Sequence, residues 1–233
     1  MKHLRLGILS LVLVCLCAGT LALTSCGKKE KSVSPMTVAT QEGVPPAEQQ
    51  IFVPSTAPIT EERTFYSFES DLNGWEIPMW TQGKTEYVAT DVEVSSDVAT
   101  EGTSSMKAAV GFPGGIWAAG LIEIEHYINL SHYRVISADI YLPPDAPEGL
   151  KAKLILTVGN NWKFVEMSRS IPLIPGEWST ITANIEPGSY DWKRVVPDEE
   201  FAADVRKIAI RIESNRKPAY SGPVYIDNIR CGR

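Results

Sequence analysis

From residue 64 onward, short apolar runs alternate with clusters of turn-forming residues. The clearest run spans 207–213, where isoleucines at 208, 210 and 212 alternate with Ala209, Arg211 and Glu213. This period of two is typical of a strand with one buried face. Ten runs are predicted to form strands: Thr64–Phe68, Glu86–Val94, Ser104–Val110, Trp117–Tyr127, Arg134–Leu142, Ala152–Val158, Lys163–Ser170, Ser179–Ile185, Lys207–Glu213 and Val224–Arg230.

Gly, Pro and Asn clusters separate these runs, as at 113–115, 143–144 and 159–161. No long amphipathic helix is expected, and Asp198–Ala203 is expected to form one helical turn at most. About ten short strands, each with one buried face, predict an all-β fold, a β-sandwich, over 61–233.

The N-terminal segment has a different pattern. Lys2 and Arg5 precede an uncharged run from Leu6 to Leu23, an order that is typical of an export signal. The run ends in Leu23-Thr24-Ser25-Cys26, which resembles the lipobox of bacterial lipoproteins. That resemblance implies removal of a signal peptide over 1–25 and acylation of Cys26, with palmitate or a related chain.

Two alternatives stay open for this segment: an ordinary secretory peptide and a membrane-spanning helix. The small polar end of the run and the lysines at 28 and 29 favour processing. A lipid anchor places the protein in the bacterial cell envelope. In enteric lipoproteins, an Asp directly after the acylated cysteine retains the protein in the inner membrane. This chain has Gly27 at that position, which favours the outer membrane.

Residues 26–60 are predicted to be a lipidated, disordered linker. They are rich in Ser, Thr, Gln and Pro and lack apolar periodicity, so they cannot bury enough surface to offset ordering. Without the signal, Cys26 and Cys231 are the only cysteines. If Cys26 carries lipid, no intramolecular disulfide can form, and Cys231 is expected to be a small apolar side chain of the last strand.

From residue 61 onward the chain has 25 acidic and 17 basic side chains, a net charge of −8. A polyanion such as a nucleic acid needs a basic surface and is therefore excluded as the expected partner. Neutral ligands, or metal ions held by carboxylates, agree better with this charge.

Three motifs in fixed order carry a second resemblance. They are Phe65-Tyr66-Ser67-Phe68-Glu69 followed by Asn73-Gly74-Trp75, then Glu101–Ala108, then Tyr220–Ile229; Pro175–Ile181 adds a fourth. Together they resemble the galactose-binding-like jelly rolls of bacterial carbohydrate-binding modules, such as families four, eleven and twenty-two. The resemblance covers residues 61–231.

In several such modules the first and last motifs build a structural calcium site. Carried over by motif, the resemblance implies that Glu69, Glu101 and Asp227 supply carboxylate ligands. The backbone carbonyls of Ser67 and Ser104 would complete the site. Ca²⁺ accepts such mixed oxygen ligands. The alternative is a set of solvated or salt-bridged acids.

A sugar-binding face needs aromatic rings for stacking and planar polar groups that orient hydroxyls. Trp75 and Trp178 are expected in the core. Trp80, Trp117, Trp162 and Trp192 lie in or beside loops and are the stacking candidates, with partial burial as the alternative.

Arg211 and Glu213 share one face of their strand and are polar candidates, unless they form only an ion pair. Asp139 and Tyr141 are weaker additions to that face.

The sequence therefore predicts a non-catalytic surface lipoprotein that binds a neutral polysaccharide. The alternative is a structural, adhesion or protein-interaction lipoprotein that uses the same fold. An enzyme is not expected, because only His126 and His132 follow the signal and no nucleophile-elbow, zinc or phosphate-loop motif is present. Both histidines are expected at strand ends or turns.

Overall fold

The computed structural model describes residues 51–216 and 218–233. Within them lie eleven β-strands and one short 3-10 helix. They are β1 Glu62–Tyr66, η1 Met79–Thr81, β2 Ala89–Ser95, β3 Ser105–Pro113, β4 Trp117–Ile128, β5 Val135–Tyr141, β6 Leu150–Val158, β7 Lys163–Glu166, β8 Ile171–Pro172, β9 Trp178–Asn184, β10 Val205–Asn215 and β11 Ala219–Gly232. The all-β prediction is confirmed.

Each of the ten predicted runs overlaps a strand, whereas the two-residue β8 was not predicted. The 198–203 segment forms turns and no helix. In the part of the chain that the structure describes, no helix has the length and apolar character needed to cross a membrane. The predicted signal, Cys26 and most of the predicted linker lie outside the described residues.

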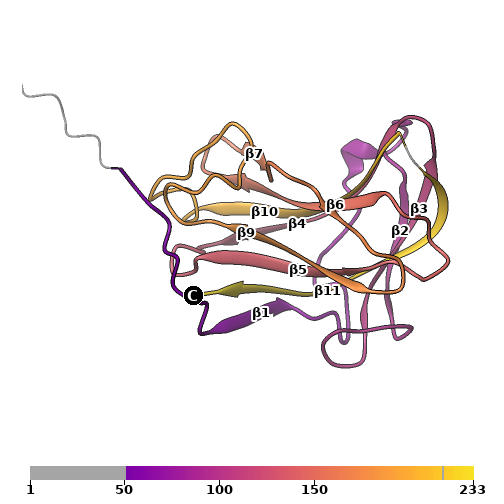
Figure 1. Ribbon diagram of the computed structural model, residues 1–233, viewed down its shortest axis with the longest axis horizontal. Helices are drawn as coiled ribbons and strands as arrows, with labels where there is room; N and C mark the ends of the chain where they lie inside the picture. Colours follow the sequence, from indigo (N-terminus) through magenta and orange to yellow (C-terminus); the bar gives the residue numbers. More distant parts are fainter. Residues whose placement is uncertain (1–50, 217) are drawn as a thin grey trace, which may run out of the picture. The chain divides into compact units, whose positions relative to one another are not determined.

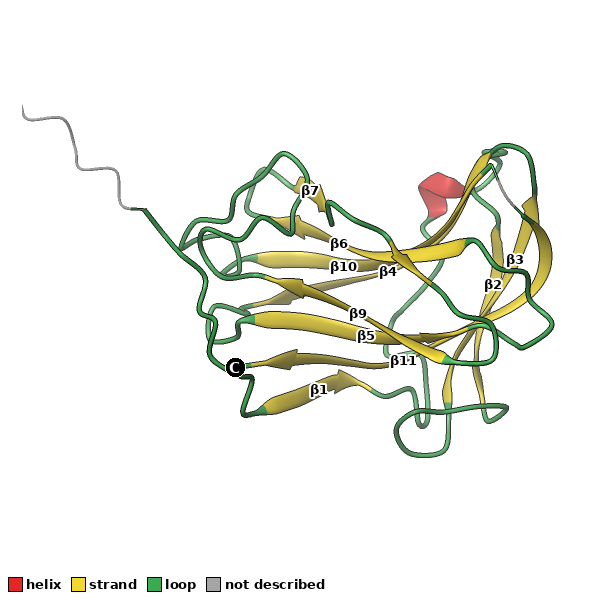
Figure 2. Ribbon diagram, viewed as in Figure 1, coloured by secondary structure: helices red, strands yellow, loops and turns green. Residues whose placement is uncertain are grey.

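Two antiparallel sheets form the sandwich (Figures 1 and 2). Sheet A has the order β2-β3-β11-β5-β9, and β1 also pairs with β11. Sheet B has the order β4-β10-β6-β7, and β8 pairs with β6. The register of β1 on β11, from Glu62 opposite Gly232 to Tyr66 opposite Ile229, places the first and last strands of the domain side by side.

The core lies between the sheets. Ile208, Ile210 and Ile212 of β10 are at most 2% exposed, as their alternation predicts. Each fully buried side chain of this size contributes about 1.5–3 kcal/mol. Trp75 is also in this core, which confirms its prediction. Cys231 is a buried free thiol in β11, also as expected.

Trp178 does not lie in the core. It stands opposite Tyr141 in the β5–β9 register, and their ring centroids are 5.4 Å apart. Because Ile140 of β5 points into the core, Asp139 and Tyr141 point to the outer face of sheet A. Asp139 and Tyr141 thus share a face, as predicted, but that face belongs to sheet A. The expectation that they could join Arg211 and Glu213, which lie on sheet B, is wrong.

The residues just before β1 lie against the domain. The Arg134 guanidinium donates hydrogen bonds to the carbonyl oxygens of Ser55 (2.6 Å) and Ala57 (2.9 Å). The Ser55 amide donates to a Glu186 carboxylate oxygen (3.2 Å), and the Thr60 amide donates to the Arg233 carbonyl oxygen (2.9 Å). Contacts with the folded domain thus begin several residues before the predicted boundary at 61.

Candidate functional site

The outer face of sheet B is built by residues that alternate with the core positions. In the register of the sheet, Arg211 of β10 lies between Leu121 of β4 and Lys153 of β6. Two residues earlier in β10, Ala209 lies beside Ile155 of β6. Leu121, Ile155 and Ala209 form a small apolar cluster that is separate from the main core, and Tyr87 packs against it.

Aromatic rings gather at one end of this face. The Tyr87 ring lies edge-on to the rings of Trp80 and Trp117, with centroid distances of 5.0 and 6.4 Å. Backbone hydrogen bonds from Ala119 to Glu86 and from Val88 to Ala119 hold this segment beside β4. Trp80 and Trp117 are 45% and 37% exposed, so part of each ring is open to a ligand. We call these three residues the Trp117 cluster.

A second group lies toward the other end of β4. Trp162, at the turn between β6 and β7, lies edge-on to Tyr127 with a centroid distance of 6.0 Å. The Arg206 guanidinium is 5.2 Å from the Trp162 ring centroid and 5.5 Å from that of Tyr127. The two rings are 41% and 58% exposed. We call these three residues the Trp162 cluster.

The two clusters are far apart along the sheet. Trp117 and Tyr127 are ten residues apart on β4 and, with an even spacing, point to the same face. At roughly 3.3 Å per residue, a strand of this length spans at most about 33 Å. A ligand that touches both clusters must therefore be a long chain.

Charged side chains occupy the sheet between the clusters. Arg211 makes ion pairs with Glu166 (2.6 Å) and Glu213 (3.1 Å). The Lys153 ammonium is 4.0 Å from each of these carboxylates and donates to the Met167 carbonyl oxygen. Burial lowers the pKa of Lys153, although both carboxylates oppose that shift. The predicted face of Arg211 and Glu213 is therefore correct, and their charges are satisfied within the protein.

Trp192 does not belong to this surface. It is only 2% exposed, packs on Phe201 and donates from Nε1 to the Asn184 carbonyl oxygen at 2.7 Å. The expected stacking role of Trp192 does not hold in this structure, because no ring face is available. Flanking polar residues gave no sign of this burial, because the contacts come from Asn184 in β9 and from Phe201 in the 198–203 turns, on either side of the Trp192 segment.

Sequence reasoning also missed three members of the two clusters, namely Tyr87, Tyr127 and Arg206. Tyr127 had a usable signal, because it shares the spacing of Trp117 within one predicted strand. Tyr87 and Arg206 had none, because their ring contacts depend on how separate segments pack.

The predicted calcium residues lie around one loop. Glu69 Oε2 accepts hydrogen bonds from the Thr103 amide (2.9 Å) and hydroxyl (3.0 Å). Asp227 Oδ2 accepts from the amides of Thr100 (2.8 Å) and Glu101 (3.0 Å). Burial, together with the nearby Glu101 charge, raises the pKa of Asp227.

This oxygen-rich donor set agrees with Ca²⁺, and Ser67 and Ser104 flank it in sequence. Among the described residues, however, no group of three or more His, Cys, Asp and Glu has the geometry of a metal site. The calcium site stays a prediction.

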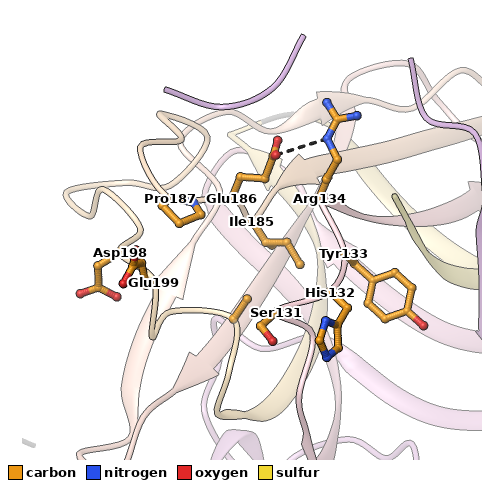
Figure 3. A pocket seen from close by; sticks show the side chains of 10 residues that line it. Ser131, His132, Tyr133, Arg134, Ile185, Glu186, Pro187, Asp198 and Glu199 are labelled. Atoms are coloured by element: carbon orange, nitrogen blue, oxygen red, sulfur yellow. Dashed lines mark hydrogen bonds and ion pairs between the residues drawn. The ribbon is translucent and has the colours of Figure 1, made fainter. Parts of the chain in front are cut away.

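Distinct hollows lie at the end of the sandwich where the segment before β1 enters. One, of about 290 Å³, is lined by the 131–134 turn, 185–187 and the 198–202 turns (Figure 3). Arg134 and Glu186 pair across one side of it at 3.3 Å, while Asp198 and Glu199 lie on another side (Figure 3). A second hollow, beside β1 and β4, shares His132 and Tyr133 with the first.

A protein-family model described as "Mannanase, galactose-binding domain-like" matches residues 66–228. The chain has no significant match among curated proteins.

Solved structures of carbohydrate-binding modules are similar to the domain. CBM27-1 of Caldicellulosiruptor saccharolyticus, solved with mannohexaose, is 19% identical over 73% of this chain and 96% of that one, with a TM-score of 0.51. CBM28, a module specific for non-crystalline cellulose, is 16% identical over 75% and 96%, with a TM-score of 0.52. The family 11 module of Clostridium thermocellum Lic26A-Cel5E is 18% identical over 76% and 97%, with a TM-score of 0.45. The first two likenesses confirm the predicted jelly-roll fold.

Proposed function

The chain belongs to the mannanase galactose-binding-like domain family, and from this premise we propose that it is a non-catalytic glycan-binding protein whose ligand is a neutral polysaccharide such as a mannan. The ligand chain lies along the outer face of sheet B, from the Trp117 cluster toward the Trp162 cluster. The observation that carries this proposal is the pair of half-exposed aromatic clusters on one open sheet face.

The chemistry of the face agrees with a neutral sugar chain. Exposed indole rings offer flat apolar surfaces for the apolar faces of sugar rings. Arg211 and Lys153 together balance the charges of Glu166 and Glu213, so the remaining hydrogen-bonding capacity of this network suits hydroxyl groups better than a charged ligand.

Backbone strain at Trp162 supports its role. Its φ is 54°, in the left-handed region that a bulky residue rarely adopts. Such strain is typical of functional positions. The conformation sets the indole beside Tyr127 and Arg206, and Trp162 remains 41% exposed there.

Titration of the full-length protein in detergent with mannohexaose tests the proposal. A dissociation constant in the micromolar-to-millimolar range, about −8 to −4 kcal/mol, is expected from a few stacked rings and hydrogen bonds. Trp117→Ala and Trp162→Ala should each cost about 1–3 kcal/mol, by analogy with base–aromatic stacking. Tyr190→Ala is the matched control, because Tyr190 is 83% exposed and belongs to neither cluster.

Failure of the wild-type protein to bind mannohexaose or any other neutral polysaccharide would reject glycan binding. Retained binding in both Trp variants would reject this face. If glycan binding is rejected, the remaining function is protein interaction or adhesion, to which exposed aromatic residues are equally suited.

We also propose that a lipid on Cys26 anchors the protein in the bacterial cell envelope, with the outer membrane favoured. The motif at 23–26 and the preceding apolar run support this anchor. Cys26→Ser should abolish incorporation of labelled palmitate and release the protein from the membrane fraction. Unchanged partitioning of that variant would contradict the anchor.

A further inference from the structure

A hollow at the edge of the sandwich concentrates the basic and aromatic groups of this end of the domain. It has a volume of about 610 Å³ and lies between β1, the end of β4 and the following turn. Its lining includes Arg63, Phe65, His126, His132, Tyr133 and Arg233. We call it the edge hollow.

The charge of the edge hollow is opposite to that of the domain. No Asp or Glu is among its lining residues, although the chain from residue 61 has a net charge of −8. Both histidines that follow residue 3 line it. This concentration of donors is what an anionic group requires.

Arg63 is the cation that is free to bind a ligand. In residues 51–216 and 218–233, its guanidinium makes no salt bridge and lies 5.1 Å from the Phe65 ring centroid. Arg233, by contrast, pairs with Glu61. Arg63 therefore keeps its full capacity for a bidentate contact with a carboxylate.

His126 adds a directed polar group. The Tyr66 hydroxyl and His126 Nδ1 are 2.5 Å apart. Burial raises the pKa of Tyr66 to about 12, so this hydroxyl stays protonated and can donate to Nδ1. In the tautomer that accepts this hydrogen bond, the ring proton is on Nε2, which can donate to a ligand.

The nearby acidic side chains do not cancel the positive charge of the edge hollow. Glu61 and Glu62 line an adjoining hollow, where Glu61 is paired with Arg233 and Glu62 with Arg230 at 3.3 Å. Glu125 is 3.6 Å from Lys207. Asp198 and Glu199 line the neighbouring hollow, on a side away from His132 and Tyr133 (Figure 3).

Two rings complete the lining of the edge hollow. Phe65 and Tyr133 lie edge-on with a centroid distance of 5.7 Å, and both are partly exposed. We propose that the edge hollow is a second binding site and that its ligand is an acidic saccharide, a sugar ring that bears a carboxylate. The carboxylate meets Arg63 and the histidines, and the ring packs on Phe65 and Tyr133.

This site goes beyond the proposed function, because it lies at the sandwich edge and its ligand is charged. Tetragalacturonate is the probe, and neutral galactotetraose is its matched control. Titration of the full-length protein in detergent should show binding of tetragalacturonate and about tenfold weaker binding, or none, of galactotetraose.

Variants separate the two sites. Arg63→Gln and His132→Gln should each weaken tetragalacturonate binding, the former about tenfold, and leave mannohexaose binding unchanged. Trp117→Ala should have the reverse effect. Arg194→Gln removes the same charge from an exposed position outside the hollow and should change neither titration.

Three results would overturn the second site: no binding of tetragalacturonate, equal binding of both tetrasaccharides, or an unchanged affinity in Arg63→Gln. Loss of tetragalacturonate binding in Trp117→Ala would also overturn it, because the acidic ligand would then lie on sheet B. If the wild-type protein binds tetragalacturonate but neither mannohexaose nor any other neutral polysaccharide, the proposed function is rejected and the edge hollow is left intact.

Discussion

The guanidinium of Arg211 lies over the ring of Trp117, with Cζ 5.8 Å from the ring centroid. The same guanidinium pairs through Nη2 with Glu166 and through Nε with Glu213. The network of charged residues in the centre of sheet B thus fixes an aromatic ring at its end. Arg211 is a positioning residue for the proposed stacking surface.

Arg211→Gln should destabilise the domain by about 2 kcal/mol, because it leaves two largely buried carboxylates with less compensation. It should also remove the guanidinium that packs on the Trp117 ring, which is measured as a change in tryptophan fluorescence. Arg211→Lys is the control, since it retains charge but cannot make both contacts of the planar fork. Urea unfolding curves of the three proteins measure the effect. Equal stability of wild type and Arg211→Gln would contradict the network's role.

Glu166 should contribute to acid sensitivity. Burial opposes ionisation, but the Lys193 hydrogen bond and the charges of Arg211 and Lys153 lower its pKa below the usual 4.5. The folded state therefore binds this proton less readily than the unfolded state. The stabilisation is complete above the unfolded pKa and is lost as pH falls through the lower, folded pKa.

Glu166→Gln should lower stability at pH 7 and flatten its decline between pH 5 and 3, a range set by ordinary carboxyl groups. Unfolding by urea at several pH values tests this, with Glu177→Gln as an exposed control. Parallel pH profiles for Glu166→Gln and wild type would exclude the predicted contribution.

Trp192 should act in stability alone. Trp192→Phe removes the Nε1 donor and leaves the Asn184 carbonyl oxygen without it, at a cost of about 1–3 kcal/mol. Mannohexaose affinity should stay unchanged at temperatures where the variant is folded. A selective loss of affinity with normal stability would return Trp192 to the ligand surface.

Calcium should stabilise the loop at 100–104 if the predicted site exists. Adding Ca²⁺ to EDTA-treated protein should raise the melting temperature, and Glu69→Gln should abolish the rise. Thr103→Val is a useful comparison, because it removes a hydroxyl that binds Glu69 without removing a proposed carboxylate ligand. An identical melting temperature with Ca²⁺ and with EDTA would mean that the acids serve only as hydrogen-bond acceptors.

Cys231 should be inert toward thiol reagents. Burial raises its pKa to about 12, and the side chain is 2% exposed. The reactive thiolate is therefore scarce in the folded protein. Iodoacetamide at pH 8 should modify the peptide that contains Cys231 only after denaturation, as measured by mass spectrometry. Rapid modification of the native protein would indicate that β11 opens readily.

The strands were predictable because each depends on a local pattern. The alternation at 207–213 fixed which side of β10 is buried, and β4 and β6 followed the same rule. The two-residue β8 carried no such pattern, because two residues have no period. The candidate site was predictable in part, since Trp80, Trp117, Trp162, Arg211 and Glu213 lie on or beside sheet B, whereas Trp192 does not.

By itself, the amino-acid sequence determined the class of fold and the face on which each β10 side chain lies, because period-two burial and turn chemistry act over a few neighbouring residues. Only the tertiary structure decided which tryptophans keep an open ring, which charges pair, and that Arg63, His126 and His132 line one hollow. Those outcomes depend on contacts between strands and turns that are far apart in the chain. The free energy of such contacts comes from packing and desolvation, which no local pattern encodes.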